Sequence, residues 1–127
     1  MKKILLALVT VAFAVSTFAG EFADVSIKEV KALAESKKAV IIDVNGTESY
    51  DQGRVPGALN YDVIKDKLAS SLPADKDTLI IAYCGSPKCK AYKDAAEAAE
   101  KLGYKNVKHM SAGIKGWKAA GEKLEKS

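Results

Sequence analysis

The sequence predicts a single α/β domain, a parallel β-sheet with helices on both of its faces. Two continuous apolar runs rich in β-branched residues, 39–44 and 78–83, are typical of strands buried on both sides of such a sheet. Helical patterns precede and follow these runs, and this alternation implies parallel connections. The chain has 127 residues, of which 48% are hydrophobic and 28% charged, which suits one ordinary globular domain.

The first half of the domain begins with a predicted helix over 27–35. Ser26, followed three residues later by Glu29, is a capping box, and apolar residues recur after it at helical spacing. Proline and glycine in the stretch 55–58 break regular structure, because proline fixes φ and glycine permits a turn. The other elements expected in this half are the strand 39–44, one helical turn over 47–52 that ends at Gly53, and a short strand over 59–61.

The second half begins with a predicted helix over 63–72, with Val63, Leu68 and Leu72 facing inward and Pro73 ending it. The strand 78–83 follows, and Cys84 comes directly after its carboxyl end, the edge at which parallel sheets bind ligands. Beyond a tight loop we expect a helix over 90–102 with Gly103 as its C-cap, a strand over 105–110, and a last helix over 114–124 whose Trp117 packs into the core.

Residues 1–19 have the layout of a secretory signal peptide. Lys2 and Lys3 precede a run of uncharged residues whose apolar middle gives way to small residues near Ala19. We expect cleavage after Ala19, which leaves 20–127 as the domain. An uncleaved anchor is the alternative, but the run is short for a membrane span of about 20 residues. We therefore expect an exported protein without stable membrane insertion, periplasmic in a Gram-negative source and otherwise secreted.

Charge and histidine content limit the classes of partner. The formal net charge is +4, and removing Lys2 and Lys3 leaves about +2, so we expect no nucleic-acid partner. His109 is the only histidine, and no second type of metal ligand clusters with it in the sequence. We therefore expect a structural histidine, no metal site and no organic cofactor.

The loop 84–91 is the strongest candidate for chemistry. It joins a strand to a helix, so its backbone N–H groups and the positive end of the helix dipole favour an anion at its centre. A cysteine in such a place, near lysines, has a lowered pKa, so Cys84 is predicted to be a reactive nucleophile. An inert buried thiol is the alternative. We expect the anion-binding loop to consist of Gly85, Ser86, Lys88, Cys89 and Lys90.

Five segments, in this order, resemble the rhodanese family of sulfurtransferases, and together they cover nearly all of 20–127. They are 42–44, where a strand ends in aspartate and valine; 50–60, with Arg54 in place of the usual histidine; 83–84, where a strand enters the active-site loop; 102–107; and 112–117. Each segment alone is a weak signal, whereas five with matching spacing are specific. The resemblance implies a rhodanese-like α/β fold with Cys84 as the catalytic residue.

The resemblance also implies a mechanism in two half-reactions. The Cys84 thiolate would take the outer sulfur of thiosulfate or of a polysulfide, which forms a persulfide and releases sulfite or a shortened polysulfide. Cyanide or a thiol acceptor, on a small molecule or a protein, would then take this sulfur. The loop amides would stabilise negative charge on the sulfur atoms.

The loop departs from the family's pattern at Cys89, where many members carry arginine. Lys88 and Lys90 flank this position and could supply positive charge, although without the bidentate geometry of arginine. Cys89 could attack a persulfide on Cys84, the pair could cycle between dithiol and disulfide, or Cys89 could be a small core hydrophobe. A carrier of sulfane sulfur that turns over only with a partner is a further alternative. A phosphatase of this fold would need a longer loop ending in arginine, and Lys90 stands there.

Two charged residues outside the loop are candidate supporting residues. Asp43 ends the strand 39–44 and could order the loop through hydrogen bonds, or it could cap its own strand. Arg54 is the only arginine of the chain and could meet an anion near the site. Pairing of Arg54 with a surface carboxylate is the interpretation that we favour.

Overall fold

The computed structural model describes residues 22–127, so the expected signal segment 1–19 and its cleavage point lie outside the described residues. Residues 22–127 contain a five-stranded parallel sheet in the order β1-β5-β4-β2-β3. The predicted parallel α/β class is therefore confirmed. The strands are β1 Ala23–Asp24, β2 Ala39–Asp43, β3 Leu59–Asn60, β4 Leu79–Tyr83 and β5 Asn106–His109.

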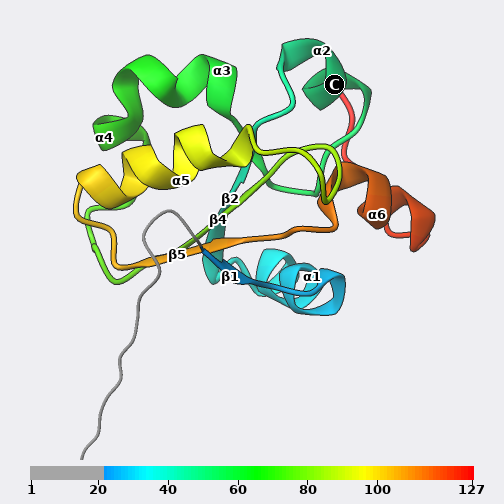
Figure 1. Cartoon of the computed structure of the whole chain (residues 1–127), viewed down its shortest axis with the longest axis horizontal. Helices are drawn as coiled ribbons and strands as arrows, with labels where there is room; N and C mark the ends of the chain where they lie inside the picture. Colours follow the sequence, from blue (N-terminus) through cyan, green and yellow to red (C-terminus); the bar gives the residue numbers. More distant parts are fainter. Residues whose placement is uncertain (1–21) are drawn as a thin grey trace, which may run out of the picture.

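Helices cover both faces of this sheet (Figure 1). One face carries α3 Tyr61–Ile64, α4 Leu68–Ser71 and α5 Tyr92–Lys101. The other face carries α1 Ile27–Ser36 and α6 Gly113–Ala119. The short α2 Thr47–Gln52 lies beside the carboxyl terminus, as Figure 1 shows.

The central strand β4 divides its side chains between two cores. Ile80, Ala82 and Cys84 belong to the core shared with α5, whereas Ile81 and Tyr83 belong to the core shared with α1 and α6. This division arises because successive side chains of a strand point to opposite faces of the sheet. Both faces of β4 are thus buried, which explains its continuous apolar sequence.

Local signals in the sequence fix several element ends as predicted. The Glu29 amide donates to Ser26 Oγ and the Ser26 amide donates to Glu29 Oε1, each at 3.1 Å, so the capping box begins α1. Gly103, with a φ of +100°, follows the end of α5. Trp117 is buried, and its ring N–H donates to the Lys123 carbonyl at 2.8 Å.

The expected helix 63–72 is wrong in its continuity and in the placement of Val63. The segment is divided into α3, the 3₁₀ turn Lys65–Lys67 and α4. Val63, expected inside, is 57% exposed. Leu68 and Leu72 are buried as predicted, and Ile64 is the third buried residue in place of Val63. The spacing of four between these three residues aligns their side chains along a helical segment.

Two further differences concern the ends of the domain. The last helix ends at Ala119 and not at Leu124, because Gly121 adopts a φ of +74° that ends a helix. The strand β1 has two residues and pairs with β5, and sequence reasoning missed it. No helix within residues 22–127 has both the length and the apolar composition needed to cross a membrane.

Candidate active site

The carboxyl ends of β2, β4 and β5 bring the candidate residues to one edge of the sheet. In the sheet register, Asp43 is paired with Tyr83, and Ala82 with His109. Cys84 directly follows Tyr83, so it lies at the end of the central strand. This is the edge at which parallel sheets bind their ligands.

Cys84 and Cys89 are joined by a disulfide, with 6.2 Å between their Cα atoms. Cys84 is 1% exposed, whereas Cys89 is half-buried. The Cys89 amide donates to the Ser86 carbonyl at 3.0 Å and closes a turn that contains Pro87. The sequence left the redox state of this pair open, and the structure describes its oxidised form. In that form the Cys84 sulfur is not a nucleophile, since the thiolate is the reactive species.

The main chain of the loop holds hydrogen-bond donors that the fold does not use. Within residues 22–127, the N–H groups of Gly85, Ser86, Lys88 and Lys90 donate to no protein acceptor. The helix α5 begins at Tyr92, two residues later than predicted, and so leaves this stretch as loop. Gly85 and Ser86 are half-buried, and Lys88 and Lys90 are exposed. Free amides in front of a helix N-terminus favour an anion.

The start of the loop is held by the N-terminus of α6. The Ile114 and Lys115 amides donate to the carbonyl oxygens of Cys84 and Gly85, each at 2.9 Å. Gly113 has a φ of +68°, and a Cβ built there would lie 2.6 Å from the carbonyl carbon and oxygen of Gly85. Glycine alone fits both this conformation and this approach. Sequence reasoning did not identify this contact.

Asp43 is fully buried and connects three segments. Its Oδ2 accepts from the Tyr83 hydroxyl at 2.6 Å, and its Oδ1 accepts from the Asn45 amide at 2.8 Å. The same hydroxyl accepts from the Val55 amide at 3.1 Å. Burial raises the pKa of Asp43 against the effect of these donors, and burial also raises the pKa of Tyr83. Asp43 therefore both caps its own strand and fixes the residue that precedes Cys84.

Asn45 is a polar residue beside the loop that sequence reasoning missed. It lies just beyond β2, and its Oδ1 is 3.5 Å from the position of a Cβ built on Gly85. Its Nδ2 is buried and has no hydrogen-bond partner within residues 22–127. Because β2 and β4 are neighbours in the sheet, the chain that follows β2 passes beside the start of this loop. The sequence carries no local signal for this contact, since it depends on which strands pair.

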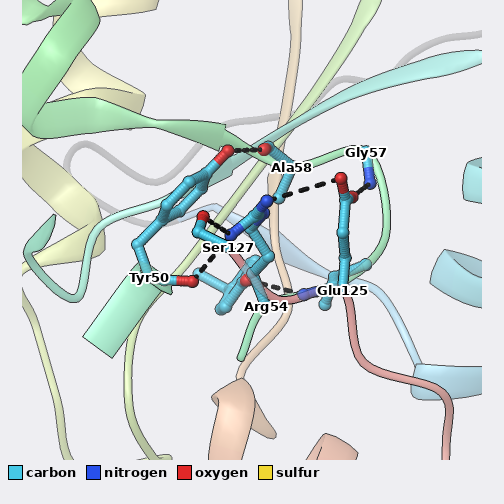
Figure 2. A network of polar contacts seen from close by, with 8 residues as sticks. Tyr50, Arg54, Gly57, Ala58, Glu125 and Ser127 are labelled. Atoms are coloured by element: carbon cyan, nitrogen blue, oxygen red, sulfur yellow. Dashed lines mark hydrogen bonds and ion pairs between the residues drawn. The ribbon is translucent and has the colours of Figure 1, made fainter. Parts of the chain in front are cut away.

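Arg54 is engaged with the carboxyl-terminal segment (Figure 2). Its guanidinium donates to the Tyr50 carbonyl and to Ser127 Oγ, each at 2.9 Å, and lies 3.4 Å from Glu125 Oε2. It also stacks over the Tyr50 ring, with 4.1 Å from Cζ to the ring centroid. The Gly57 amide donates to Glu125 at 2.6 Å and, with the Arg54 charge, lowers the pKa of Glu125. The contacts of Arg54 thus match the favoured pairing with a surface carboxylate.

His109 is buried and lies against an aromatic ring. It stacks on Tyr92 with 3.4 Å between ring centroids and 2° between planes. Burial lowers the pKa of His109, which favours the neutral ring at pH 7. Within residues 22–127 no three His, Cys, Asp or Glu side chains gather as metal ligands. His109 thus has the surroundings of a structural histidine.

A sequence model of the rhodanese-like domain matches residues 26–120. The chain belongs to the rhodanese-like domain family. The resemblance predicted from five segments is therefore confirmed. The crystal structure of thiosulfate sulfurtransferase from Pseudomonas aeruginosa superposes on this rhodanese-like domain with a TM-score of 0.67 at 24% identity, covering 83% of this chain and 20% of that one. This similarity shows a shared fold.

Two curated relatives share sequence with this rhodanese-like domain. The mouse thiosulfate sulfurtransferase/rhodanese-like domain-containing protein 3 is 28% identical over 107 residues, with 73% of this chain and 66% of the relative matched. An HTH-type transcriptional regulator of Mycobacterium tuberculosis is 35% identical over 89 residues, with 68% of this chain and 38% of the relative matched. The chain thus spans between about a third and two thirds of these relatives.

The buried carboxyl of Asp43 gives a pH-dependent prediction. Its pKa in the folded state is raised above the ordinary value of 3.8, so folding favours the protonated acid. This contribution is complete below pH 3.8 and is lost as the pH rises through the raised value. We expect the stability of the wild type relative to Asp43→Asn to fall over that range. Urea unfolding of both proteins at each pH measures it, and a flat or rising difference contradicts it.

The contact between α6 and the loop gives a second prediction, with Gly121 as the matched control. Gly121 also has a positive φ, +74°, but a Cβ there meets nothing within 4 Å. Gly121→Ala should destabilise the fold by about 1–2 kcal/mol through strain alone. Gly113→Ala adds a steric clash, so its loss should be about 1–3 kcal/mol larger. Denaturant unfolding measures both losses, and equal values would show that the loop tolerates the added methyl group.

Proposed function

We propose that this protein is a sulfurtransferase that carries sulfane sulfur as a persulfide on Cys84. The placement of Cys84 carries the proposal, since it lies at the carboxyl end of the central strand, before a loop of unused amides. Membership of the rhodanese-like domain family supports it, as do the names of relatives that include thiosulfate sulfurtransferase. The donor that we propose is thiosulfate or a polysulfide.

The reaction begins with the Cys84 thiolate. It attacks the outer sulfur of thiosulfate, a bond to that sulfur forms, and sulfite leaves with the electron pair of the broken S–S bond. The free amides of Gly85 and Ser86 and the N-terminus of α5 favour the negative charge on the persulfide. The Asn45 side chain lies beside Gly85, and its buried Nδ2, which has no partner within residues 22–127, is a further donor that we propose for this anion. Cyanide or a thiolate then takes the outer sulfur and restores the Cys84 thiolate.

The disulfide favours a second candidate, a thiol-disulfide redox activity in which Cys89 acts after sulfur transfer. The Cys89 thiol attacks the inner sulfur of the Cys84 persulfide, a Cys84–Cys89 bond forms, and hydrosulfide leaves. The product of this step is the disulfide that the structure contains. Under this proposal the protein releases sulfide and needs a thiol to reduce it after each cycle.

We also propose that the protein is exported, with 1–19 as a cleaved signal peptide. The basic start and apolar run of the sequence support this, and a disulfide persists more readily in the oxidising conditions outside the cytoplasm. Intact-mass spectrometry of protein recovered from the exported fraction tests it. A mass that begins at Gly20 agrees with export, whereas an unprocessed mass contradicts cleavage.

The sulfurtransferase proposal predicts a persulfide that depends on one residue. Reduced protein incubated with thiosulfate or polysulfide should gain the mass of one sulfur atom on Cys84. It should then release thiocyanate when cyanide is added. Cys84→Ala removes the covalent nucleophile, so the rate of thiocyanate release should fall by about 10³-fold or more. Intact mass and a colorimetric thiocyanate assay measure the two outcomes.

The variant Cys89→Ser separates the two candidate activities and is the control for Cys84→Ala. It should keep the persulfide and thiocyanate release, because the nucleophile is intact. If the redox step operates, this variant should lose sulfide release. Sulfide release that is equal in the wild type and in Cys89→Ser would overturn the second candidate, and a persulfide that persists in Cys84→Ala would overturn the first.

A further inference from the structure

A hollow of about 320 Å³ lies beside the Cys89 end of the loop. Its aromatic wall consists of Phe22, Tyr92 and His109, with Phe22 edge-on to Tyr92 at 6.2 Å between centroids and Tyr92 stacked on His109. Its remaining lining includes Cys89, Lys90 and Lys93. The volume is at the small end of ligand pockets, which suits a molecule of a few heavy atoms.

Of the two disulfide cysteines, Cys89 lines the hollow and Cys84 is not among its lining residues. Cys89 is half-buried and lines it, whereas Cys84 is 1% exposed and belongs to the core shared with α5. A thiolate must approach the sulfur that it attacks, so access decides which of the two is attacked. Residue burial thus favours attack on Cys89, in which Cys84 would be the leaving group.

The charges around the hollow select the kind of thiol. Lys90 is exposed and Lys93 half-buried, and both contribute positive charge to the lining. His109 adds an imidazole ring to the lining, and Asp24 is the carboxylate that interacts with this ring. Among residues 22–127, the side chains that line the hollow include two lysines and no acid. The charge of this lining is therefore positive, which favours an anion.

We propose that this hollow is the binding site for a small anionic thiol, one that carries a carboxylate or sulfonate group, which reduces the disulfide by attack on Cys89. The proposal rests on the proposed function in one respect, because the freed Cys84 is the nucleophile of that function. Under this proposal the thiol binds in the hollow beside Cys89. The proposed function places the sulfur donor elsewhere, at the amides of Gly85 and Ser86.

The electron balance of the reduction needs two molecules of thiol. The first thiolate forms a bond to Cys89 Sγ, the Cys84–Cys89 bond breaks, and Cys84 leaves as a thiolate with the electron pair. A second thiolate attacks the sulfur of the bound thiol, and Cys89 leaves as a thiolate. The thiols are oxidised to one small disulfide, and the protein is reduced to its dithiol form.

The test compares two thiols that differ in charge, 2-mercaptoethanesulfonate and the neutral 2-mercaptoethanol, on the oxidised full-length protein. Each reduction rate is divided by the rate of the same thiol with a neutral cyclic disulfide, which removes intrinsic reactivity. We expect the anionic thiol to be favoured about 3- to 10-fold, the effect of one or two exposed ion pairs. No preference, or a preference for the neutral thiol, would overturn the proposal.

Matched variants distinguish a local site from net charge. Lys90→Gln combined with Lys93→Gln should lower the preference to about 1, because the lining loses its positive charge. Lys101→Gln combined with Lys105→Gln changes the net charge equally, at the last residue of α5 and in the segment before β5, and should keep the preference. Loss of the preference in both double variants would contradict a local site.

The position of the intermediate is the second readout. Acid quenching during reduction, followed by peptide mapping, should find the bound thiol on Cys89. An adduct on Cys84 would overturn the proposed direction of attack. No sulfane donor takes part in these measurements, so they can fail while Cys84 still forms a persulfide, and the persulfide assay can fail while the thiol preference stands.

Discussion

The two hydrogen bonds from α6 to the carbonyl groups of Cys84 and Gly85 determine where the chain leaves the central strand. They are main-chain bonds, so they persist whatever side chains the loop carries. A cradle of amides stabilises an anion only if the donors are already in place when the charge arrives. The hydrogen bonds at the start of the loop supply that condition, and the absence of a side chain at Gly113 permits them.

Strand alternation separates the carboxylate of Asp43 from the sulfur of Cys84. Asp43 is opposite Tyr83 in the sheet register and bonds to its hydroxyl, on the face covered by α1 and α6. Cys84 belongs to the other face, in the core shared with α5. A carboxylate beside the sulfur would raise the pKa of the thiol, because like charges disfavour ionisation. The hydrogen bond between Asp43 and Tyr83 can therefore join the ends of β2 and β4 without disfavouring a thiolate at Cys84.

The parts of the fold that the sequence predicts well are those with a local cause. The capping box at Ser26 and Glu29 and the apolar runs of β2 and β4 carry their signal within a few residues. The two-residue β1 is too short to have a pattern, and no proline or glycine marks the 3₁₀ turn Lys65–Lys67 that divides the expected helix. Near the candidate site, the place of Cys84 at the end of β4 was predictable from the apolar run that precedes it. The contacts of Gly113 and Asn45 were not, since they depend on chain segments that only the tertiary structure brings to the loop.

The contacts of Arg54 with the tail make residues 121–127 part of the folded unit, although the family match ends at residue 120. Main-chain bonds in both directions between Arg54 and Glu125 add a short antiparallel bridge there. A recombinant fragment trimmed to the matched boundaries would leave the buried guanidinium of Arg54 without its counter-ion. It would also remove Glu125, the partner of Arg54 in the antiparallel bridge. A recombinant form of this domain should therefore retain residues 121–127, because Glu125 neutralises the charge of Arg54.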